Sequence, residues 1–252
     1  MGVSLDRALE IATQLTIETT SEVVPLGGAA GRILFNDLAS KVDDPRFDNS
    51  AMDGWAVREA DCQESGAILR IVGTSQAGSE EVPNVGEGEA CSIMTGAPLP
   101  EGSDAIVMVE DSTTQNGSVA INGPARPGYI RRRGENLLEG NVALNSGTLL
   151  TPAAISLAAT MGHGDVSVVR KPRIAVIGVG DELTPPGEPL SEGAIYESNT
   201  FGISSLVEKM GGFPRRFDLI RDSIDNLRDA LDEASESCDA IITSGGVSMG
   251  KW

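Results

Sequence analysis

The sequence predicts an α/β and β-rich multidomain protein, because two regions of the chain have different patterns. Between Val23 and Val142, short runs of β-branched residues are separated by Gly, Pro, Asn and Asp, which is typical of a sheet domain with many loops. From Arg173 onward, strand-like apolar runs alternate with helix-like segments, which predicts a doubly wound α/β domain. The sequence ends at Trp252, just after the third of these strands, so we expect this α/β domain to be incomplete.

Two helices flank the β-rich region. Ser4 is placed to cap the first helix, in which apolar residues keep a spacing of three or four. Thr151 and Pro152 favour the start of the second helix, which we expect to end at Gly162. Between these helices, the clearest strand candidates are residues 67–73, 105–111 and 118–122.

The α/β region opens with an apolar run at 173–180, which has the character of a buried parallel strand. In the helix expected near its end, Ile224, Leu227 and Leu231 share one face. A glycine pair follows the last strand directly. The elements expected after the first strand are a helix at 199–210, a strand at 213–220, a helix at 223–237 and a strand at 239–244.

Composition narrows the classes of function. The 252 residues carry a formal net charge of −18 at pH 7, which argues against nonspecific binding to nucleic acid and to an anionic membrane surface. No stretch approaches the roughly 18 apolar residues of a membrane span, and the start of the chain lacks the features of a signal peptide. The cysteines Cys62, Cys91 and Cys238 form no CxxC pattern. We therefore expect a cytoplasmic protein with reduced cysteines.

A single histidine limits the chemistry. His163 lies between two glycines after an apolar helix, so we interpret it as a turn residue. A Ser-His-Asp triad or a site with several histidines is excluded unless it uses His163. The chemistry then depends on carboxylates, hydroxyls, backbone amides and cations.

Three polar segments fall where ligands bind in an open α/β sheet, at the carboxyl ends of the strands. They contain Glu182 (GDEL), Asp222 (IRDS) and the loop SGGVS at 244–248. The glycine pair can bring backbone N–H groups close to a phosphate, and the two carboxylates can hold Mg²⁺ against it. Alternatively, Asp222 caps a helix, Glu182 is a solvated loop residue and the glycine pair is a turn.

The β-rich region has three further polar segments. In DNSAMDGWAV (48–57), polar side chains including Asp53 lie beside Met52 and Trp55. In MTGAPLPEGSDAIVMVE (94–110), Thr95 and Gly96 are placed to contact an anion, or they begin a loop with prolines. RRRGEN (131–136) is the main basic cluster, explained nearly as well by a solvated strand edge as by an anion site.

Taken together, these segments resemble the MoeA proteins and the gephyrin E domain. The resemblance rests on eight segments that occur in the family's order and extends over nearly the whole chain. They are DNSAMDGWAV, MTGAPLPEGSDAIVMVE, RRRGEN, TPAAISLAATMG, GVGDEL, PGEPLSEGAIYESN, IRDS and SGGVSMG.

The resemblance implies a domain plan and an activity. The expected plan is an N-terminal domain (1–45 plus 141–170), a β-rich inserted domain (46–140) and an incomplete molybdopterin-binding α/β domain (171–252). Members of this family are expected to form an elongated homodimer. They insert molybdate into molybdopterin-AMP and release AMP with the help of Mg²⁺. The molybdopterin adenylyltransferase is a candidate partner. No nucleic acid or membrane is expected to bind.

Carried over from the family, the functional positions fall in both regions. The expected catalytic residues are Asp53, Thr95, Glu182 and Asp222, of which Glu182 and Asp222 would bind the metal. The expected substrate-binding residues are Ser244, Gly245, Gly246, Ser248, Arg133 and Asn136.

The sequence also departs from the family, and alternatives follow. Asn136 stands where the family usually has Asp, and later acidic and lysine groups of the family site would lie past Trp252. We therefore expect the 252-residue chain alone to be inactive. One alternative is a non-catalytic binding or scaffolding module. Another is a molybdopterin adenylyltransferase, against which the long region before Arg173 argues.

Overall fold

The computed structural model describes residues 3–79, 81–221 and 223–245, which divide into two compact units. The first, called here the α/β unit, comprises Met1–Asn36, Gly147–Thr151 and Asp165–Trp252. The second, called the β unit, comprises Asp37–Ser146 and Pro152–Gly164. The boundaries of the three family domains stay a prediction.

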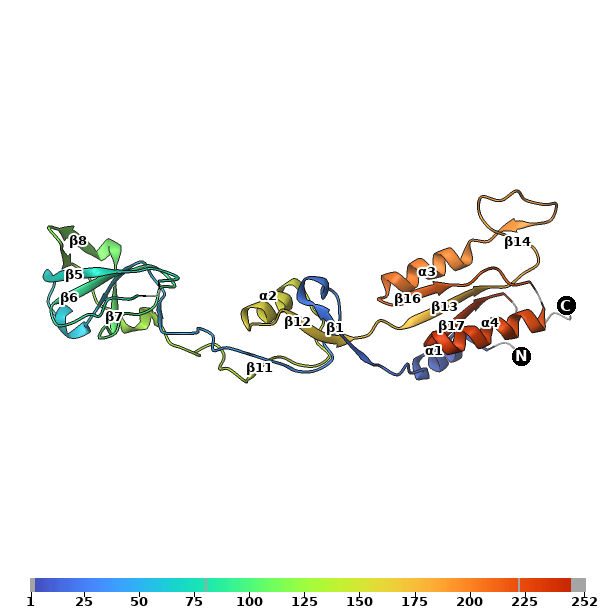
Figure 1. Ribbon diagram of the computed structural model, residues 1–252, viewed down its shortest axis with the longest axis horizontal. Helices are drawn as coiled ribbons and strands as arrows, with labels where there is room; N and C mark the ends of the chain where they lie inside the picture. Colours follow the sequence, from blue (N-terminus) through green and yellow to red (C-terminus); the bar gives the residue numbers. More distant parts are fainter. Residues whose placement is uncertain (1–2, 80, 222, 246–252) are drawn as a thin grey trace. The chain divides into compact units, whose positions relative to one another are not determined.

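The β unit is built on a six-stranded sheet in the order β7-β4-β6-β5-β9-β8 (Figure 1). All neighbouring strands are antiparallel except β5 and β6, which are parallel. Both faces of β4 are buried, so its sequence shows no alternation of polar and apolar residues. The bounds are β4 (Gly54–Val57), β5 (Ala67–Ser75), β6 (Glu89–Ile93), β7 (Ala105–Met108), β8 (Ser112–Gln115) and β9 (Ser118–Ile121).

Apolar clusters cover the two faces of this sheet. Trp55 and Val57 belong to one cluster, whereas Ala56 belongs to the other, as expected for successive side chains of a strand. The predicted strands at 67–73 and 118–122 are confirmed, as β5 and β9. The predicted strand at 105–111 is too long, because β7 ends at Met108 and Val109–Asp111 form a 3₁₀ turn.

Smaller elements complete the β unit. β2 (Leu38–Ala39) pairs with β11 (Val142–Leu144), and β3 (Asn49–Ser50) pairs with β10 (Ile130–Arg131). The predicted second helix is confirmed as α2 (Pro152–Thr160), which begins at the proline and buries two alanines.

The α/β unit starts with a helix and a strand. Ser4 accepts a hydrogen bond from the Arg7 backbone N–H at 3.3 Å, which confirms the predicted cap of α1 (Leu5–Gln14). No residue of α1 is buried, so its apolar side chains face outward. β1 (Ser21–Pro25) then pairs antiparallel with β12 (Asp165–Val169), a partner more than a hundred residues further along the chain.

A parallel sheet in the order β16-β13-β17 forms the rest of this unit, as predicted. Its strands are β13 (Arg173–Gly178), β16 (Phe213–Arg216) and β17 (Ala240–Ser244). Helices α3 (Asn199–Lys209) and α4 (Ile224–Ser237) lie on opposite faces of the sheet, which is the doubly wound arrangement (Figure 1). The central strand β13 is buried after its first residue.

Three details differ from the sequence-based expectation. Ile224 does not join the apolar face of α4, because it is 78% exposed while Leu227 and Leu231 pack on the sheet. The strand expected at 213–220 stops at Arg216. A short parallel pair, β14 (Leu183–Thr184) and β15 (Ile195–Tyr196), lies in a segment for which no strand was predicted.

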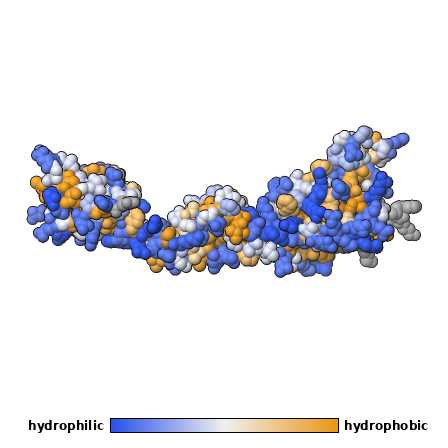
Figure 2. Space-filling view, viewed as in Figure 1, coloured by the Kyte–Doolittle hydropathy of each residue, from blue (hydrophilic) through white to orange (hydrophobic). Residues whose placement is uncertain are grey.

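Apolar residues also reach the surface, where Figure 2 shows them scattered among hydrophilic ones. Such scatter is normal for a folded protein. None of the described helices has the length and apolarity that crossing a membrane demands.

Candidate functional site

In the β unit, Asp53 and Thr95 lie in contact. Asp53 precedes β4 and Thr95 follows β6, and the antiparallel pairing of Gly54 with Ile93 places these two strand ends side by side. The Asp53 carboxylate accepts hydrogen bonds from the Thr95 backbone N–H at 2.7 Å and from the Thr95 hydroxyl at 3.0 Å. These bonds, the backbone one first, hold the pKa of Asp53 below its ordinary value. The pair therefore presents an ionised carboxylate in a fixed position.

The turn at Thr95 is also closed by its own backbone. The Gly96 N–H donates to the Ser50 carbonyl at 2.8 Å. The backbone N–H groups of Thr95 and Gly96, the two residues placed to contact an anion, are thus both used inside the loop. Asp53 and Thr95 act here as one exposed polar unit and not as an open anion-binding turn.

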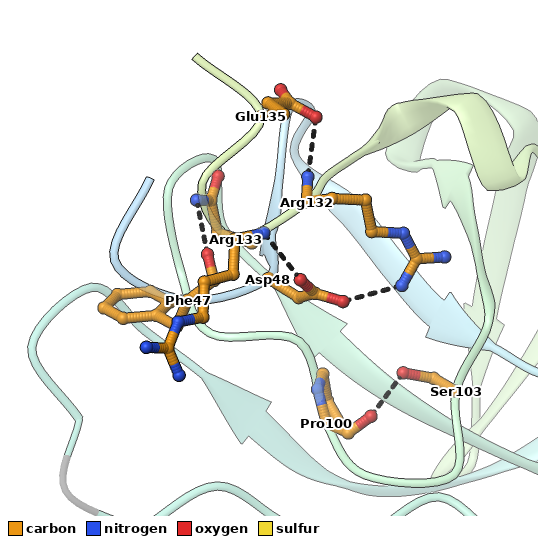
Figure 3. A network of polar contacts seen from close by, with 8 residues as sticks. Phe47, Asp48, Pro100, Ser103, Arg132, Arg133 and Glu135 are labelled. Carbon is orange, nitrogen blue, oxygen red and sulfur yellow. Dashed lines mark hydrogen bonds and ion pairs between the residues drawn. The ribbon is translucent and has the colours of Figure 1, made fainter. Parts of the chain in front are cut away.

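The basic cluster at 131–133 is largely neutralised. Asp48 accepts from the Arg132 guanidinium at 2.6 Å and from the Arg133 backbone N–H at 2.8 Å (Figure 3). Burial acts to raise the pKa of Asp48, but these two hydrogen bonds outweigh it and the pKa is lowered. Asp43 binds the Arg133 side chain at 2.5 Å. The cluster is therefore a network of ion pairs.

Asn136 is explained by its neighbour. Its side-chain amide donates to the Asp44 carboxylate at 3.1 Å, and its backbone N–H donates to the Asp44 carbonyl at 3.0 Å. An aspartate at this position would bring two like charges together, which the neutral amide avoids. Asp43 and Asp44 were not predicted as part of this network, because their contacts depend on pairing with a segment about ninety residues away.

In the α/β unit, Ser244 and Gly245 lie at the carboxyl edge of the sheet. The Asn199 amide donates to the Ser244 hydroxyl at 2.8 Å, and the Val179 N–H donates to the Ser244 carbonyl at 2.9 Å. Gly245 has φ +93°, and a Cβ there would lie 2.1 Å from the Val179 carbonyl oxygen. Only glycine fits this close approach of two chain segments.

Glu182 lies at the same edge, just after β13. Its side chain is exposed and folds back on Gly180, where an added Cβ would be 2.6 Å from the carboxylate. The Gly180 N–H donates to the Ile220 carbonyl at 3.1 Å, so the segments before positions 182 and 222 run side by side. Asp222, Gly246 and Ser248 themselves lie outside the described residues.

Sequence reasoning missed the residue that orders the start of α3. Glu197 is only 4% exposed, and its carboxylate accepts from the Thr200 backbone N–H and the Thr200 hydroxyl, each at 2.6 Å. Asn199, which binds Ser244, lies between them. The sequence did contain a signal for this contact, because Glu197 lies three residues before Thr200 at the start of a helix. An acidic side chain at this spacing can accept hydrogen bonds from the free N–H groups of the first helical turn.

The donor set for a metal is partial. Within residues 3–79, 81–221 and 223–245, no three His, Cys, Asp or Glu side chains lie close enough to hold an ion. Glu182 supplies carboxylate oxygens, which suit Mg²⁺. Of the two carboxylates predicted to hold Mg²⁺, only Glu182 lies within the described residues, and Mg²⁺ stays a prediction.

The fold and these residues define a class of protein. A loop-rich β unit precedes a doubly wound α/β domain whose carboxyl edge has a glycine-only turn, a hydroxyl and a carboxylate. A family model described as "MoeA N-terminal region (domain I and II)" matches residues 3–162, and one described as "Probable molybdopterin binding domain" matches residues 175–251. The chain belongs to the MoeA family.

Individual relatives agree with this assignment. The chain is 39% identical to a molybdopterin molybdenumtransferase of Haemophilus influenzae over 99% of its own length and 62% of that protein. It is 39% identical to a molybdopterin molybdenumtransferase 2 of Mycobacterium tuberculosis over 91% of its length and 58% of that protein. The chain thus spans about three fifths of the length of these curated relatives.

Solved structures show the same fold. The molybdopterin biosynthesis MoeA protein from Pyrococcus horikoshii matches with a TM-score of 0.85 at 34% identity, covering 96% of this chain and 63% of that one. A second structure, of a molybdopterin biosynthesis MoeA protein from Pyrococcus horikoshii OT3, matches with a TM-score of 0.82 at 31% identity, covering 90% of this chain and 62% of that one.

Proposed function

We propose that this chain acts in molybdenum cofactor biosynthesis as a molybdopterin molybdenumtransferase, which inserts molybdate into adenylylated molybdopterin and releases AMP. The observation that carries the proposal is the pair of family matches, which together span both the β-rich region and the α/β region. The relatives with this printed name align with the chain over nearly its full length.

The residues of the α/β unit have the chemistry that an adenylylated substrate needs. We assign the phosphate-binding role to Ser244 and Gly245, together with Gly246 and Ser248, because a glycine turn after a parallel strand can offer backbone N–H groups to an anion. Asn199 fixes the Ser244 hydroxyl at 2.8 Å. Glu182 would hold Mg²⁺ together with Asp222, and the ion would neutralise phosphate charge when bound.

The residues of the β unit provide fixed charges. Asp53 stays ionised while Thr95 holds its carboxylate, so the pair can orient a donor group of the substrate. Arg133 and Asn136 are held by Asp43 and Asp44, which limits them to positioning the loop that carries them. Catalysis by such groups depends on placement and not on a protein nucleophile.

The test is a hybrid in which the 252 residues replace the matching part of the Haemophilus influenzae relative. Supplied with molybdopterin-AMP, Mg²⁺ and molybdate, the hybrid should release AMP. Glu182→Gln should lower the rate of AMP release by about 100-fold, because it removes one charged ligand of the Mg²⁺ ion that would neutralise the phosphate. Glu188→Gln, a nearby exposed carboxylate, is the matched control and should stay within about twofold.

Equal rates for the Glu182→Gln and Glu188→Gln hybrids would contradict the assigned role of Glu182. A folded hybrid that binds molybdopterin-AMP and releases no AMP would favour the scaffolding alternative, for which the pairing of Asn136 with Asp44 is the supporting observation. The adenylyltransferase alternative is disfavoured by the family match to residues 3–162.

We also propose that the protein is a homodimer. The apolar side chains of α1 support this, because Leu5 is 75% exposed and Leu9 is 56% exposed, and no residue of this helix is buried in the described part of the chain. A two-fold contact is the commonest way to cover such a surface. Light scattering at micromolar concentration should give the dimer mass, and Leu5→Ser/Leu9→Ser should shift it to the monomer. A monomer mass for the unmodified chain would contradict the proposal.

A further inference from the structure

A second candidate site lies at the opposite edge of the parallel sheet. The amino ends of β13 and β16 meet there, with Arg173 paired to Phe213. They line a cavity of about 450 Å³, together with residues from the end of β12, from β1 and from the end of α4. Its lining comprises Glu22, Arg170, Lys171, Arg173, Phe213, Arg215 and Ser237.

The cavity is strongly basic in an acidic chain. Four of its lining residues are Lys or Arg, although the whole sequence has 19 such residues against 37 Asp and Glu. Only one lining residue, Glu22, is acidic. A concentration of cations of this kind in a concave surface focuses a positive potential that attracts anions.

The carboxylates around the cavity are already engaged. Asp239 accepts from the Arg170 guanidinium at 2.7 Å and from the Arg173 backbone N–H at 2.6 Å. Glu22 accepts from the Arg32 guanidinium at 2.5 Å. Arg215 is held by Glu233 and by the Ser237 hydroxyl. These bonds fix the frame of the cavity.

Two cations are left over from this frame. Within the described part of the chain, neither the Lys171 ammonium nor the Arg173 guanidinium forms an ion pair. Both side chains are exposed, so their charge is open to a ligand. Phe213 lines the same cavity and is 60% exposed, which makes a flat apolar ring available beside the two charges.

We propose that this cavity binds a small phosphorylated molecule that carries a planar ring, with Lys171 and Arg173 contacting the phosphate and Phe213 contacting the ring. Ammonium and guanidinium groups form strong charge-assisted bonds to phosphate oxygens. An exposed aromatic face suits a stacked base. The site lies at the amino edge of the sheet, whereas the residues of the α/β unit that we assign to phosphate and Mg²⁺ binding lie at or beyond the carboxyl edge.

The test is calorimetric titration of the 252-residue chain with AMP, adenosine and inorganic phosphate. AMP should bind more tightly than either fragment, and its binding should weaken between about 0.05 and about 0.5 M salt. Lys171→Gln/Arg173→Gln should raise the AMP dissociation constant by about tenfold or more. The control Arg7→Gln/Arg228→Gln removes the same charge from exposed helix ion pairs of the same unit and should stay within about twofold.

AMP binding that is equal in the two double variants would overturn the proposal, and so would an absence of AMP binding at millimolar concentration. Phosphate binding as tight as AMP would overturn the role of the ring. Because Lys171 is exposed, the single variant Lys171→Gln keeps the test valid if the double variant fails to fold. The test is independent of the transferase activity, since it measures binding in the isolated chain.

Discussion

At the scale of single residues, several polar groups in this protein work through one neighbour. Thr95 satisfies Asp53, Asp44 satisfies Asn136, and Thr200 satisfies Glu197. In each pair, one member fixes the charge or the rotamer of the other. A substitution of either member therefore changes both, and single variants should be interpreted as changes of the pair.

The thiol of Cys62 should be unreactive. Burial, followed by the charges of Asp61 and Asp104, raises its pKa to about 11. At pH 8, about one molecule in a thousand then carries the thiolate, against roughly a quarter for an ordinary thiol of pKa about 8.5. Alkylation of Cys62 by iodoacetamide, measured by peptide mass spectrometry, should therefore be about 200-fold slower in the native chain than in urea. Similar rates in both states would show that the thiolate is accessible.

The residue scale also shows where sequence reasoning stops. Asp53 and Thr95 were both expected in the site from the family resemblance, but their mutual contact was not. The contact arises from the pairing of Gly54 with Ile93, which joins segments about forty residues apart. No local pattern specifies such a register.

At the scale of elements, helices and strands could be predicted where the spacing of their apolar residues is regular over several positions. The strand at Arg173–Gly178 was found because a strand buried on both faces is apolar throughout. Ile224 was assigned wrongly to the packed face of α4. Helical spacing predicts which residues share one face of a helix, but it does not predict how far along the helix that face is covered by the sheet. The two-residue strands β14 and β15 are too short for any periodic signal.

The start of α3 should depend on Glu197. Its removal leaves the Thr200 N–H and hydroxyl without their buried acceptor, which costs about 1–3 kcal/mol. Urea unfolding should therefore show a lower midpoint for Glu197→Ala. The control is Glu208→Ala within α3, because the Glu208 side chain is exposed and its removal should change the midpoint little. Equal midpoints for the two variants would refute the capping role.

At the scale of the whole molecule, charge governs the response to acid. The pKa of Glu22 is lowered mainly by Arg32, and the pKa of Asp239 is lowered mainly by Arg170. Asp43, Asp48 and Asp53 are lowered too. Carboxylates of this kind stabilise the fold above their unfolded pKa of about 4, and this stability is lost as the pH falls through their folded values.

The thermal midpoint should therefore pass through a maximum on acidification. From pH 7 to about 5, protonation relieves the self-repulsion of a chain with net charge −18, which favours the fold. Below about pH 4, the loss of the paired carboxylates dominates and the midpoint should fall. Asp239→Asn should reduce the fall, whereas Asp225→Asn, in an exposed helix ion pair, should not. A midpoint that rises continuously to pH 3 would contradict this account.

The order of the two units along the chain has a consequence for synthesis. Every segment of the β unit precedes position 165, whereas β1 must wait for β12 to pair Ser21 with Val169. On the ribosome, where domains fold as they emerge, the β unit can therefore close while β1 is still unpaired. During that interval the newborn polypeptide exposes an unpaired strand, preceded in the sequence by the amphipathic helix α1, and such a strand is open to unwanted pairing with another nascent chain.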